Sequence, residues 1–200
     1  MKVKNWMNKN VITIPPDAGL KDAIEIMHHH SIRHLPVIDQ EEMLGFVTES
    51  NLRQYLLTDL INDLTMADVM IINPITIDPN ASVDSAARLI YQYKIGGLPV
   101  LEKRKLVGII TITDILGAFI ELLGLLEEST RLDIVIDEKQ GSIDDVLKVI
   151  RNLGGKTISV GVDTQSSRKK VYYIRLEKLE IEPIIHAIED MGHKVLSLID

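Results

Sequence analysis

The feature that most constrains the fold of this chain is an internal repeat with a constant spacing of 63 positions. Met7 aligns with Met70, and the same spacing continues without a gap through both copies. Further matched pairs are Ile12/Ile75, Thr13/Thr76, Ile14/Ile77, Pro16/Pro79, Ala23/Ala86, Ile32/Ile95, Leu35/Leu98, Pro36/Pro99, Val37/Val100, Gly45/Gly108 and Thr48/Thr111. A register held over roughly 50 positions indicates two copies of one supersecondary unit.

Each copy shows the same succession of hydrophobic patterns. A short β-branched segment comes first, at 11–14 in one copy and 75–77 in the other. A proline-containing turn precedes an amphipathic helix, in which Leu20, Ala23 and Met27 recur with helical spacing. A Leu-Pro-Val strand, a polar turn, a strand that ends in Gly, two apolar residues and Thr, and a second helix follow. The repeat unit is therefore predicted to be β-α-β-β-α.

From residue 131 onward the pattern changes to a different unit. Four strands are predicted, at 131–137, 156–163, 170–176 and 194–199. Ser142 is a good N-cap for a helix after the first strand, because Asp144 and Asp145 follow it where the helix dipole favours acidic side chains. Pro183 is tolerated in the first turn of a second helix. The order β-α-β-β-α-β predicts a ferredoxin-like arrangement.

Composition narrows the classes of function. The 200 residues contain 22 Lys and Arg against 29 Asp and Glu, for a formal net charge of -7, and only 1 Trp, 5 Tyr and 2 Phe are available for base stacking. Nucleic-acid binding is disfavoured, because phosphate contacts need a basic surface. The absence of cysteine excludes disulfides, zinc-thiolate sites and a thiol nucleophile. This composition fits a reducing cytoplasm.

No segment predicts export, membrane insertion or catalysis. The first ten residues lack the apolar region of a signal peptide, and the best apolar candidate, 115–126, is shorter than the roughly 18 to 20 residues of a spanning helix. That stretch is more typical of a core or a dimer contact. Phosphate-loop, nucleophile-elbow, zinc-protease and dinucleotide-binding motifs are absent from the sequence. We therefore expect a soluble cytoplasmic protein that is not an enzyme.

The two copies resemble a pair of CBS domains, the Bateman module. The resemblance rests on the Leu-Pro-Val strands and on the motifs GFVTESN at 45–51 and GIITITD at 108–114. It implies one domain at 1–63 and a second at 64–127, packed with pseudo-twofold symmetry. The fold class expected for the whole chain is α+β, with layered helices and sheets.

The last seventy residues, 131–200, resemble an ACT domain. The first loop of that family, Asp-x-x-Gly followed by a helix, is resembled by Asp137, Gly141, Ser142 and Ile143, with three residues rather than two between the Asp and the Gly; these four are the candidate residues for a small metabolite. Gln140 departs from the family, because proline often stands at this position before the glycine. The order CBS, CBS, ACT is similar to that of the acetoin-utilisation accessory protein family.

The motif that ends each repeat contains groups that can bind phosphate and ribose. At the second motif, the Thr111 hydroxyl and the first amides of the following helix can bind phosphate oxygens. Three positions later the Asp114 carboxylate can accept two hydrogen bonds from a ribose diol. Thr48 and Asn51 repeat the arrangement without the charge, so the first site is predicted to be weaker or differently selective. The alternative is that Asp114 and Asn51 are only N-caps.

The resemblance to CBS domains implies an adenosine derivative in the cleft between the repeats, namely AMP, ADP, ATP or S-adenosylmethionine, with no further cofactor required. It assigns to this cleft Thr13, Arg33, His34, Thr48, Asn51, Thr76, Gly97, Thr111, Thr113 and Asp114. Arg33 and His34 could pair with a polyphosphate, or could lie in a solvated loop. Their equivalents, Gly96 and Gly97, carry no charge, so the two halves are chemically unequal.

The histidine-rich run at 28–34 invites a metal interpretation that we do not favour. Neighbouring helix residues point about 100° apart, so the three adjacent histidines cannot converge on one ion. Only His30 and His34 have i+4 spacing, and this pair straddles the predicted helix end. Histidines in a last turn also complement the helix C-terminus. No metal site is expected.

Two hypotheses of function remain. In the first, the chain is a regulatory sensor and a homodimer, in which the CBS pair binds an adenine nucleotide and the ACT domain binds a small metabolite or only dimerises. In the second, the chain is an accessory subunit of an acetoin-utilisation or acylation-control enzyme, acts through protein contacts, and retains nucleotide binding only as a vestige.

Overall fold

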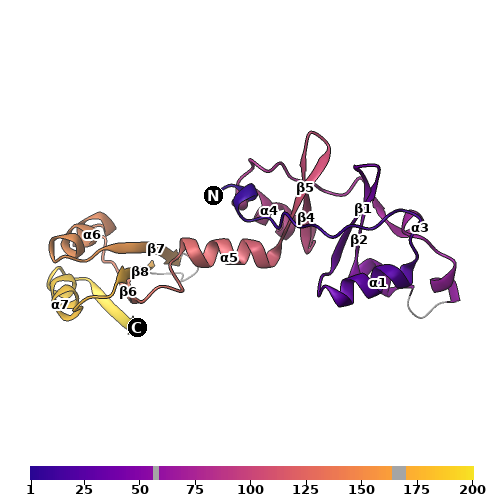
Figure 1. Cartoon of the computed structure of the whole chain (residues 1–200). Coiled ribbons are helices and arrows are strands. Elements are labelled where there is room, and N and C mark those ends of the chain that lie inside the picture. The colour runs from indigo at the N-terminus through magenta and orange to yellow at the C-terminus, as the bar shows by residue number, and fades with distance from the viewer. Residues whose placement is uncertain (56–58, 164–169) are drawn as a thin grey trace. The chain divides into compact units, whose positions relative to one another are not determined.

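The computed structural model describes residues 1–55, 59–163 and 170–200. The chain forms two compact units, Met1–Ala118 and Phe119–Asp200 (Figure 1). Within the described residues, no helix is long and apolar enough to cross a membrane. The first unit holds both copies of the repeat, and the second holds the C-terminal sheet.

The two repeats contain matching elements. The first has α1 (Leu20–His29), β1 (His34–Asp39), β2 (Glu42–Thr48) and α2 (Glu49–Arg53), and the second has α4 (Val83–Tyr93), β4 (Gly97–Glu102), β5 (Lys105–Thr111) and α5 (Ile112–Leu122). Both hairpins are antiparallel, and both change register at the same place, after Val37 and after Val100. Each two-residue hairpin turn, at Gln40 and Glu41 and at Lys103 and Arg104, has positive φ at both residues, as a type I′ turn requires. The repeat predicted from the sequence is thus reproduced in the backbone.

The prediction of a regular strand at the start of each copy is wrong. Ile14 and Ile77 each form only one parallel bridge, to Val37 and Val100. The next hydrogen bond of a parallel ladder would be donated two residues later, by Pro16 in the first copy and Pro79 in the second. Proline has no backbone N–H, so the ladder ends there in both copies.

The hydrophobic patterns do not predict four short elements, which are η1 (Val3–Asn5), η2 (Asp59–Asn62), α3 (Met66–Val69) and β3 (Ile71–Ile72). β3 leads into the second repeat but pairs with β2 of the first, where Gly45 lies opposite Ile72. At the equivalent place Asn8 leads into the first repeat but exchanges two backbone hydrogen bonds of 2.9 and 3.0 Å with Ile109 of β5. Each leading segment therefore joins the hairpin of the other repeat, which interlocks the two copies.

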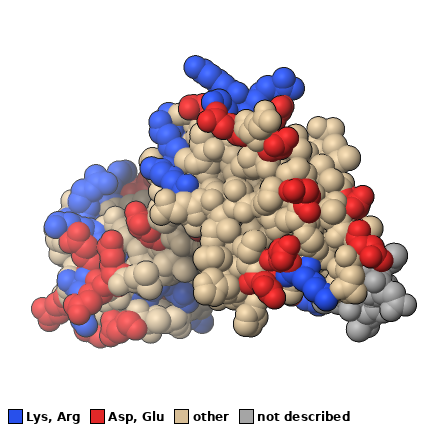
Figure 2. Space-filling view, turned by 45° about the vertical axis from the view of Figure 1, so that its right-hand side comes forward, with Lys and Arg blue, Asp and Glu red and all other residues tan. Residues whose placement is uncertain are grey.

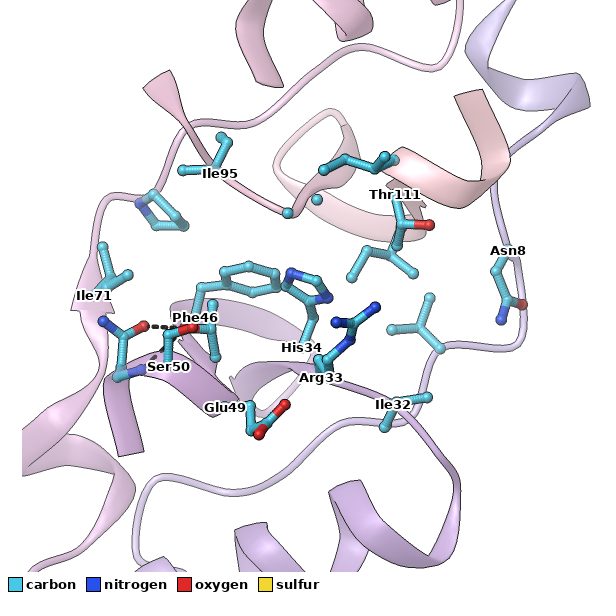
Figure 3. A pocket seen from close by; sticks show the side chains of 18 of the residues that line it. Asn8, Ile32, Arg33, His34, Phe46, Glu49, Ser50, Ile71, Ile95 and Thr111 are labelled. Atoms are coloured by element: carbon cyan, nitrogen blue, oxygen red, sulfur yellow. Dashed lines mark hydrogen bonds between the residues drawn. The ribbon is translucent and has the colours of Figure 1, made fainter. Parts of the chain in front are cut away.

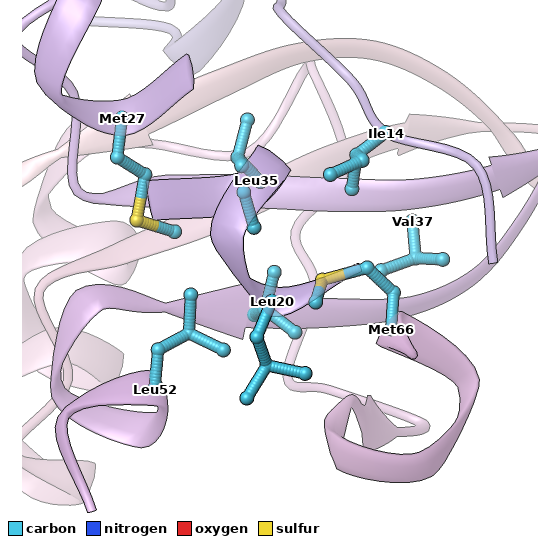
Figure 4. Close-up of a cluster of buried hydrophobic side chains, with 9 residues drawn as sticks. Ile14, Leu20, Met27, Leu35, Val37, Leu52 and Met66 are labelled. Carbon is cyan, nitrogen blue, oxygen red and sulfur yellow. The ribbon is translucent and has the colours of Figure 1, made fainter. Parts of the chain in front are cut away.

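The core of the first repeat lies between its hairpin and its helices. The buried side chains labelled in Figure 4 are Ile14, Leu20, Met27, Leu35, Val37, Leu52 and Met66. Leu20 and Met27 confirm the helical stripe predicted for α1. Met66 comes from the exchanged segment, and Val3 is buried at the equivalent position 63 residues earlier. The exchanged segments are thus part of the hydrophobic core.

The C-terminal unit is an antiparallel sheet with two helices on one face (Figure 1). Its elements are β6 (Ser129–Val135), α6 (Ile143–Asn152), β7 (Thr157–Asp163), β8 (Val171–Glu177), α7 (Glu182–Asp190) and β9 (Lys194–Ile199). The strand order is β7-β8-β6-β9, so β6 and β7 are separated by one antiparallel strand. This is the split β-α-β topology predicted from the sequence. Its core contains Leu132, Ile134, Ile150, Ile174 and Ile184.

Candidate functional site

A cavity of about 830 Å³ lies within the first unit, between its two repeats (Figure 3). Its lining residues come in pairs 63 positions apart, among them Asn10/Asn73, Ile12/Ile75, Ile32/Ile95, Arg33/Gly96, His34/Gly97, Phe46/Ile109, Thr48/Thr111, Ser50/Thr113 and Asn51/Asp114. The cavity therefore consists of two half-sites, one from each repeat. Any chemical difference between them comes from the residues that differ within a pair.

In the second half-site, Asp114 is held at the start of α5. Its Oδ2 accepts hydrogen bonds from the backbone N and from Oγ1 of Thr111, both at 2.7 Å. Thr111 precedes the helix and Asp114 is its third residue, so Asp114 is not an N-cap, as the alternative interpretation held, but the reciprocal partner of the cap. Among the described residues, no hydrogen bond engages Oδ1. The carboxylate thus retains one oxygen that can accept from a ligand.

In the first half-site, Thr48 and Asn51 have a similar geometry with different chemistry. Thr48 is the N-cap of α2 and accepts a hydrogen bond from Asn51 N at 3.2 Å. Its hydroxyl also donates to Asn51 Oδ1 at 2.6 Å. The amide oxygen of Asn51 is therefore already engaged, and its amide nitrogen is a donor. The two half-sites thus differ in chemistry, with a carboxylate oxygen in one and an amide in the other.

Arg33 and His34 distinguish the half-sites further. The His34 ring stacks on Phe46 with a centroid distance of 5.7 Å and an interplanar angle of 19°. Burial, and to a smaller extent the charge of Arg33, lower the pKa of His34 below its ordinary value of 6.5. Arg33 is exposed, and its guanidinium has no ion-pair partner among the described residues. Both side chains point into the cavity in Figure 3.

Other charged groups in the cavity are less available. Glu49 and Arg53 form an exposed ion pair at 2.9 Å. The Lys94 ammonium lies 4.0 Å from the centroid of the Tyr91 ring. Sequence reasoning missed Lys94 as a lining residue. Lys94 is the C-cap of α4 and has a left-handed backbone conformation. The sequence gives no sign of this conformation, because residues other than glycine rarely adopt it.

Eight of the ten residues assigned to the cleft line the cavity, and Thr13 and Thr76 do not. Thr13 is exposed, because alternate residues of an extended segment face opposite ways and its neighbours Ile12 and Ile14 face inward. The repeated isoleucines Ile12/Ile75 and Ile32/Ile95 line the cavity instead. Their repetition at the 63-residue spacing was the signal that could have identified them.

The histidines of the run at 28–34 belong to different structural elements. His28 and His29 end α1, His30 is the C-cap, and His34 lies on β1. The rings of His29 and His30 make an edge contact at 4.7 Å. Among the residues that the structure describes, no group of three His, Asp or Glu side chains could hold a metal ion.

The loop before α6 brings together the C-terminal candidates Asp137, Gly141, Ser142 and Ile143. Backbone N of Asp137 donates to Nδ1 of the buried His193 at 3.3 Å. Ser142 donates from its hydroxyl (2.8 Å) and its backbone N (3.1 Å) to Oδ2 of Asp145. These two bonds, followed by Lys148, lower the pKa of Asp145 to about 2. A carboxylate of the chain itself thus occupies the N-terminus of α6.

The face drawn in Figure 2 carries interspersed acidic and basic side chains rather than a continuous basic surface. This distribution agrees with the formal net charge of -7.

Sequence comparison relates this chain to known proteins. A model of the CBS domain family matches residues 3–58 and 66–121. A CBS domain-containing protein of Dictyostelium discoideum is 35% identical over 136 residues, which cover 60% of this chain and 92% of that protein. An inosine-5'-monophosphate dehydrogenase of Korarchaeum cryptofilum is 30% identical over 115 residues. The match covers 57% of this chain but only 23% of that enzyme.

Solved structures resemble about 60% of the chain. The CBS domain pair of protein MJ0100, in complex with 5'-methylthioadenosine and S-adenosyl-L-methionine, has a TM-score of 0.55 and 30% identity, over 60% of this chain and 95% of that one. A Vibrio cholerae protein described as an acetoin utilization protein (AcuB) has a TM-score of 0.57 and 32% identity, over 63% and 95%. CBSX2 in complex with AMP has a TM-score of 0.54 and 25% identity, over 60% and 96%.

Proposed function

This chain belongs to the CBS domain family, and from that premise we propose that it is a regulatory protein, without catalytic activity, that binds an adenosine derivative in the cavity between its repeats. The observation that carries the proposal is Asp114, which lines the cavity and whose Oδ2 is engaged by Thr111, while Oδ1 has no hydrogen-bond partner among the described residues. Structural neighbours with AMP or with S-adenosyl-L-methionine support the choice of ligand class.

The lining offers a complementary group for each part of such a ligand. Asp114 Oδ1 accepts from the ribose hydroxyls. The Thr111 hydroxyl already donates to Asp114 and the Ile112 amide to Gly96 O, so the Thr113 amide in the first turn of α5 is the group that can donate to phosphate. The isoleucine pairs supply an apolar surface for the base. A cavity of about 830 Å³ is within the range of small-molecule sites.

For the C-terminal unit we propose an ACT domain that assembles the chain into a homodimer and does not bind an amino acid at its first loop. The Asp145 carboxylate engages the backbone N and the hydroxyl of Ser142 at the start of α6, and Gln140 stands where the ACT family often has proline. β9 is an edge strand, with Leu196 and Leu198 48% and 40% exposed. Edge strands offer unpaired backbone groups to another chain. The proposed domains are 1–63, 64–127 and 131–200, and the proposed location is the cytoplasm.

A second candidate function is that of an accessory subunit of an acetoin-utilisation or acylation-control enzyme. The similarity to the Vibrio cholerae protein favours it. In that case protein contacts are the function, and nucleotide binding is weak or absent.

Thermal melting of the full chain with AMP, ATP and S-adenosylmethionine tests the proposal. A ligand at 100 times its dissociation constant stabilises a protein by about 2.7 kcal/mol, which raises the melting temperature by several degrees at this size. We expect such a rise for at least one ligand, and a smaller rise for the variant Asp114→Asn. A melting temperature that is unchanged by all three ligands at millimolar concentration would contradict the proposed nucleotide binding and would favour the accessory-subunit function.

A further inference from the structure

We propose that Met7 and Met70 are modification sites for peroxide, at which oxidation to methionine sulfoxide loosens the pairing of the two repeats and weakens ligand binding in the cavity between them. The effect on ligand binding rests on the proposed function, whereas the effect on stability does not. The chain has 7 methionines and no cysteine, so methionine is the only sulfur-containing residue that a peroxide can oxidise.

Met7 and Met70 occupy equivalent places in the segments that lead into the two repeats. Met70 is the C-cap of α3, directly before β3, and a Cβ built on Gly45 of β2 would collide with its sulfur. Met7 lies directly before Asn8, and a Cβ on Gly108 of β5 would collide with its sulfur. Each thioether therefore packs against the backbone of the other repeat's hairpin, at a glycine that leaves room for it.

The residue after each methionine belongs to the wall of the cavity. Asn8 exchanges its two backbone hydrogen bonds with Ile109, and Ile71 is paired with Phe46 of β2. All four of these residues line the cavity. A change in the packing of either methionine therefore acts on a pair of lining residues, one from a leading segment and one from the hairpin of the other repeat.

Oxidation changes the chemistry of this packing. The sulfur takes one oxygen atom from hydrogen peroxide: the O–O bond breaks, an S–O bond forms, the sulfur gives up two electrons, and water is released. The thioether packs as an apolar group, whereas the sulfoxide oxygen is polar and is costly to bury without a hydrogen-bond donor. Met7 and Met70 are partly exposed to solvent and hence to peroxide, whereas Met27 and Met66 are buried in the core of the first repeat.

Peroxide treatment of the full chain, followed by peptide mass spectrometry and urea unfolding, tests the inference. Unfolding is followed by the fluorescence of Trp6, the only tryptophan, which lies in the first unit. The double variant Met7→Leu/Met70→Leu removes both sulfurs and keeps apolar side chains of similar volume. Met43→Leu is the matched control, because Met43 is partly exposed on β2, does not line the cavity, and has Leu106 as its counterpart in the second repeat.

We expect peroxide to oxidise Met7 and Met70 before the buried Met27 and Met66. Oxidation should lower the urea midpoint of the wild type and of Met43→Leu by about 0.5 M or more, and their affinity for ATP by about threefold or more. The double variant should keep its midpoint and its affinity after the same treatment. Methionine sulfoxide reductases A and B should restore the oxidised wild type, which tests the same point if the double variant does not fold.

Two results would overturn the effect on stability. One is that Met7 and Met70 stay unoxidised while Met43 reacts, and the other is that the urea midpoint is unchanged after both have been oxidised. A double variant that loses as much as the wild type would also overturn it. A lower midpoint with unchanged ATP affinity would overturn the link to the cavity. An untreated wild type that binds no ATP would instead refute the proposed function, and the urea midpoints would still decide the effect on stability.

Discussion

The two oxygens of the Asp114 carboxylate have different environments. Oδ2 is engaged by Thr111 at the start of α5, whereas Oδ1 has no hydrogen-bond partner among the described residues. A substitution by alanine would therefore remove a cap and a ligand contact together. Asparagine preserves the capping oxygen and removes only the charge, as the first repeat does with Asn51.

Asp114→Asn is expected to weaken the binding of AMP and ATP by about tenfold or more, because hydrogen bonds to a charged acceptor contribute roughly 1.5 to 3 kcal/mol. Asn51→Ala should weaken it less, since the Asn51 oxygen already accepts from Thr48. Calorimetric titration measures both. Equal small losses would mean that Asp114 acts only at the helix start.

The affinity for ATP is expected to rise as the pH falls from 8 to 6.5. The pKa of His34 is lowered in the unliganded protein, by burial and then by Arg33, and a bound phosphate would raise it, so binding takes up a proton and is favoured at lower pH. The other charged groups that line the cavity are Arg33, Glu49, Arg53, Lys94 and Asp114. Titration of ATP at four pH values measures the slope.

His34→Gln is the control, because a glutamine does not titrate. Its ATP affinity should vary less with pH than that of the wild type. Adenosine, which has no phosphate, should bind with little pH dependence in both proteins. An identical slope for ATP in the variant and the wild type would assign the proton uptake to another group.

At the residue level, the sequence predicts the polar part of the candidate site better than the apolar part. Thr111 and Asp114 belong to a motif with a fixed spacing, so they could be identified without a structure. The choice of Thr13 failed because the motif gives no information on which way an extended side chain points. The contact of His34 with Gly96 could not be predicted, since it depends on how the two copies pack.

At the level of elements, the helices can be predicted from the hydrophobic spacing. The pairing of each leading segment with the hairpin of the other repeat cannot be predicted in this way. β3 has only two residues, Ile71 and Ile72, and both side chains are exposed, so no periodic pattern marks it. Its pairing with β2 depends on a close approach. A Cβ on Gly45 would collide with Met70, and one on Gly108 would collide with Met7.

Gly45→Ala and Gly108→Ala are each expected to reduce the free energy of unfolding by about 1 to 3 kcal/mol, the usual effect of overpacking. Gly117→Ala is the matched control, because a Cβ there would meet only Trp6 at 3.8 Å. In the helix α5 that change should stabilise by about 0.5 to 1 kcal/mol. Urea unfolding measures all three. Neutral changes at both Gly45 and Gly108 would contradict the close packing of the exchanged segments.

At the level of the whole molecule, the C-terminal unit is expected to dimerise without responding to amino acids. The reason is that Asp145 already occupies the start of α6, whereas the edge strand β9 is open. Sedimentation of the full chain should give a dimer, and melting should be unchanged by each of the twenty amino acids. A monomer would contradict the proposed assembly, and stabilisation by one amino acid would contradict the proposed lack of a ligand.

The most direct test of the ligand site is a crystal structure of the full chain grown with saturating ATP. We expect the adenosine in the cavity between the repeats, with its ribose hydroxyls within hydrogen-bond distance of Asp114 Oδ1 and its phosphates near Thr111. Well-ordered crystals with that cavity empty, or with the nucleotide bound elsewhere, would contradict the assignment of the cavity as the adenosine site.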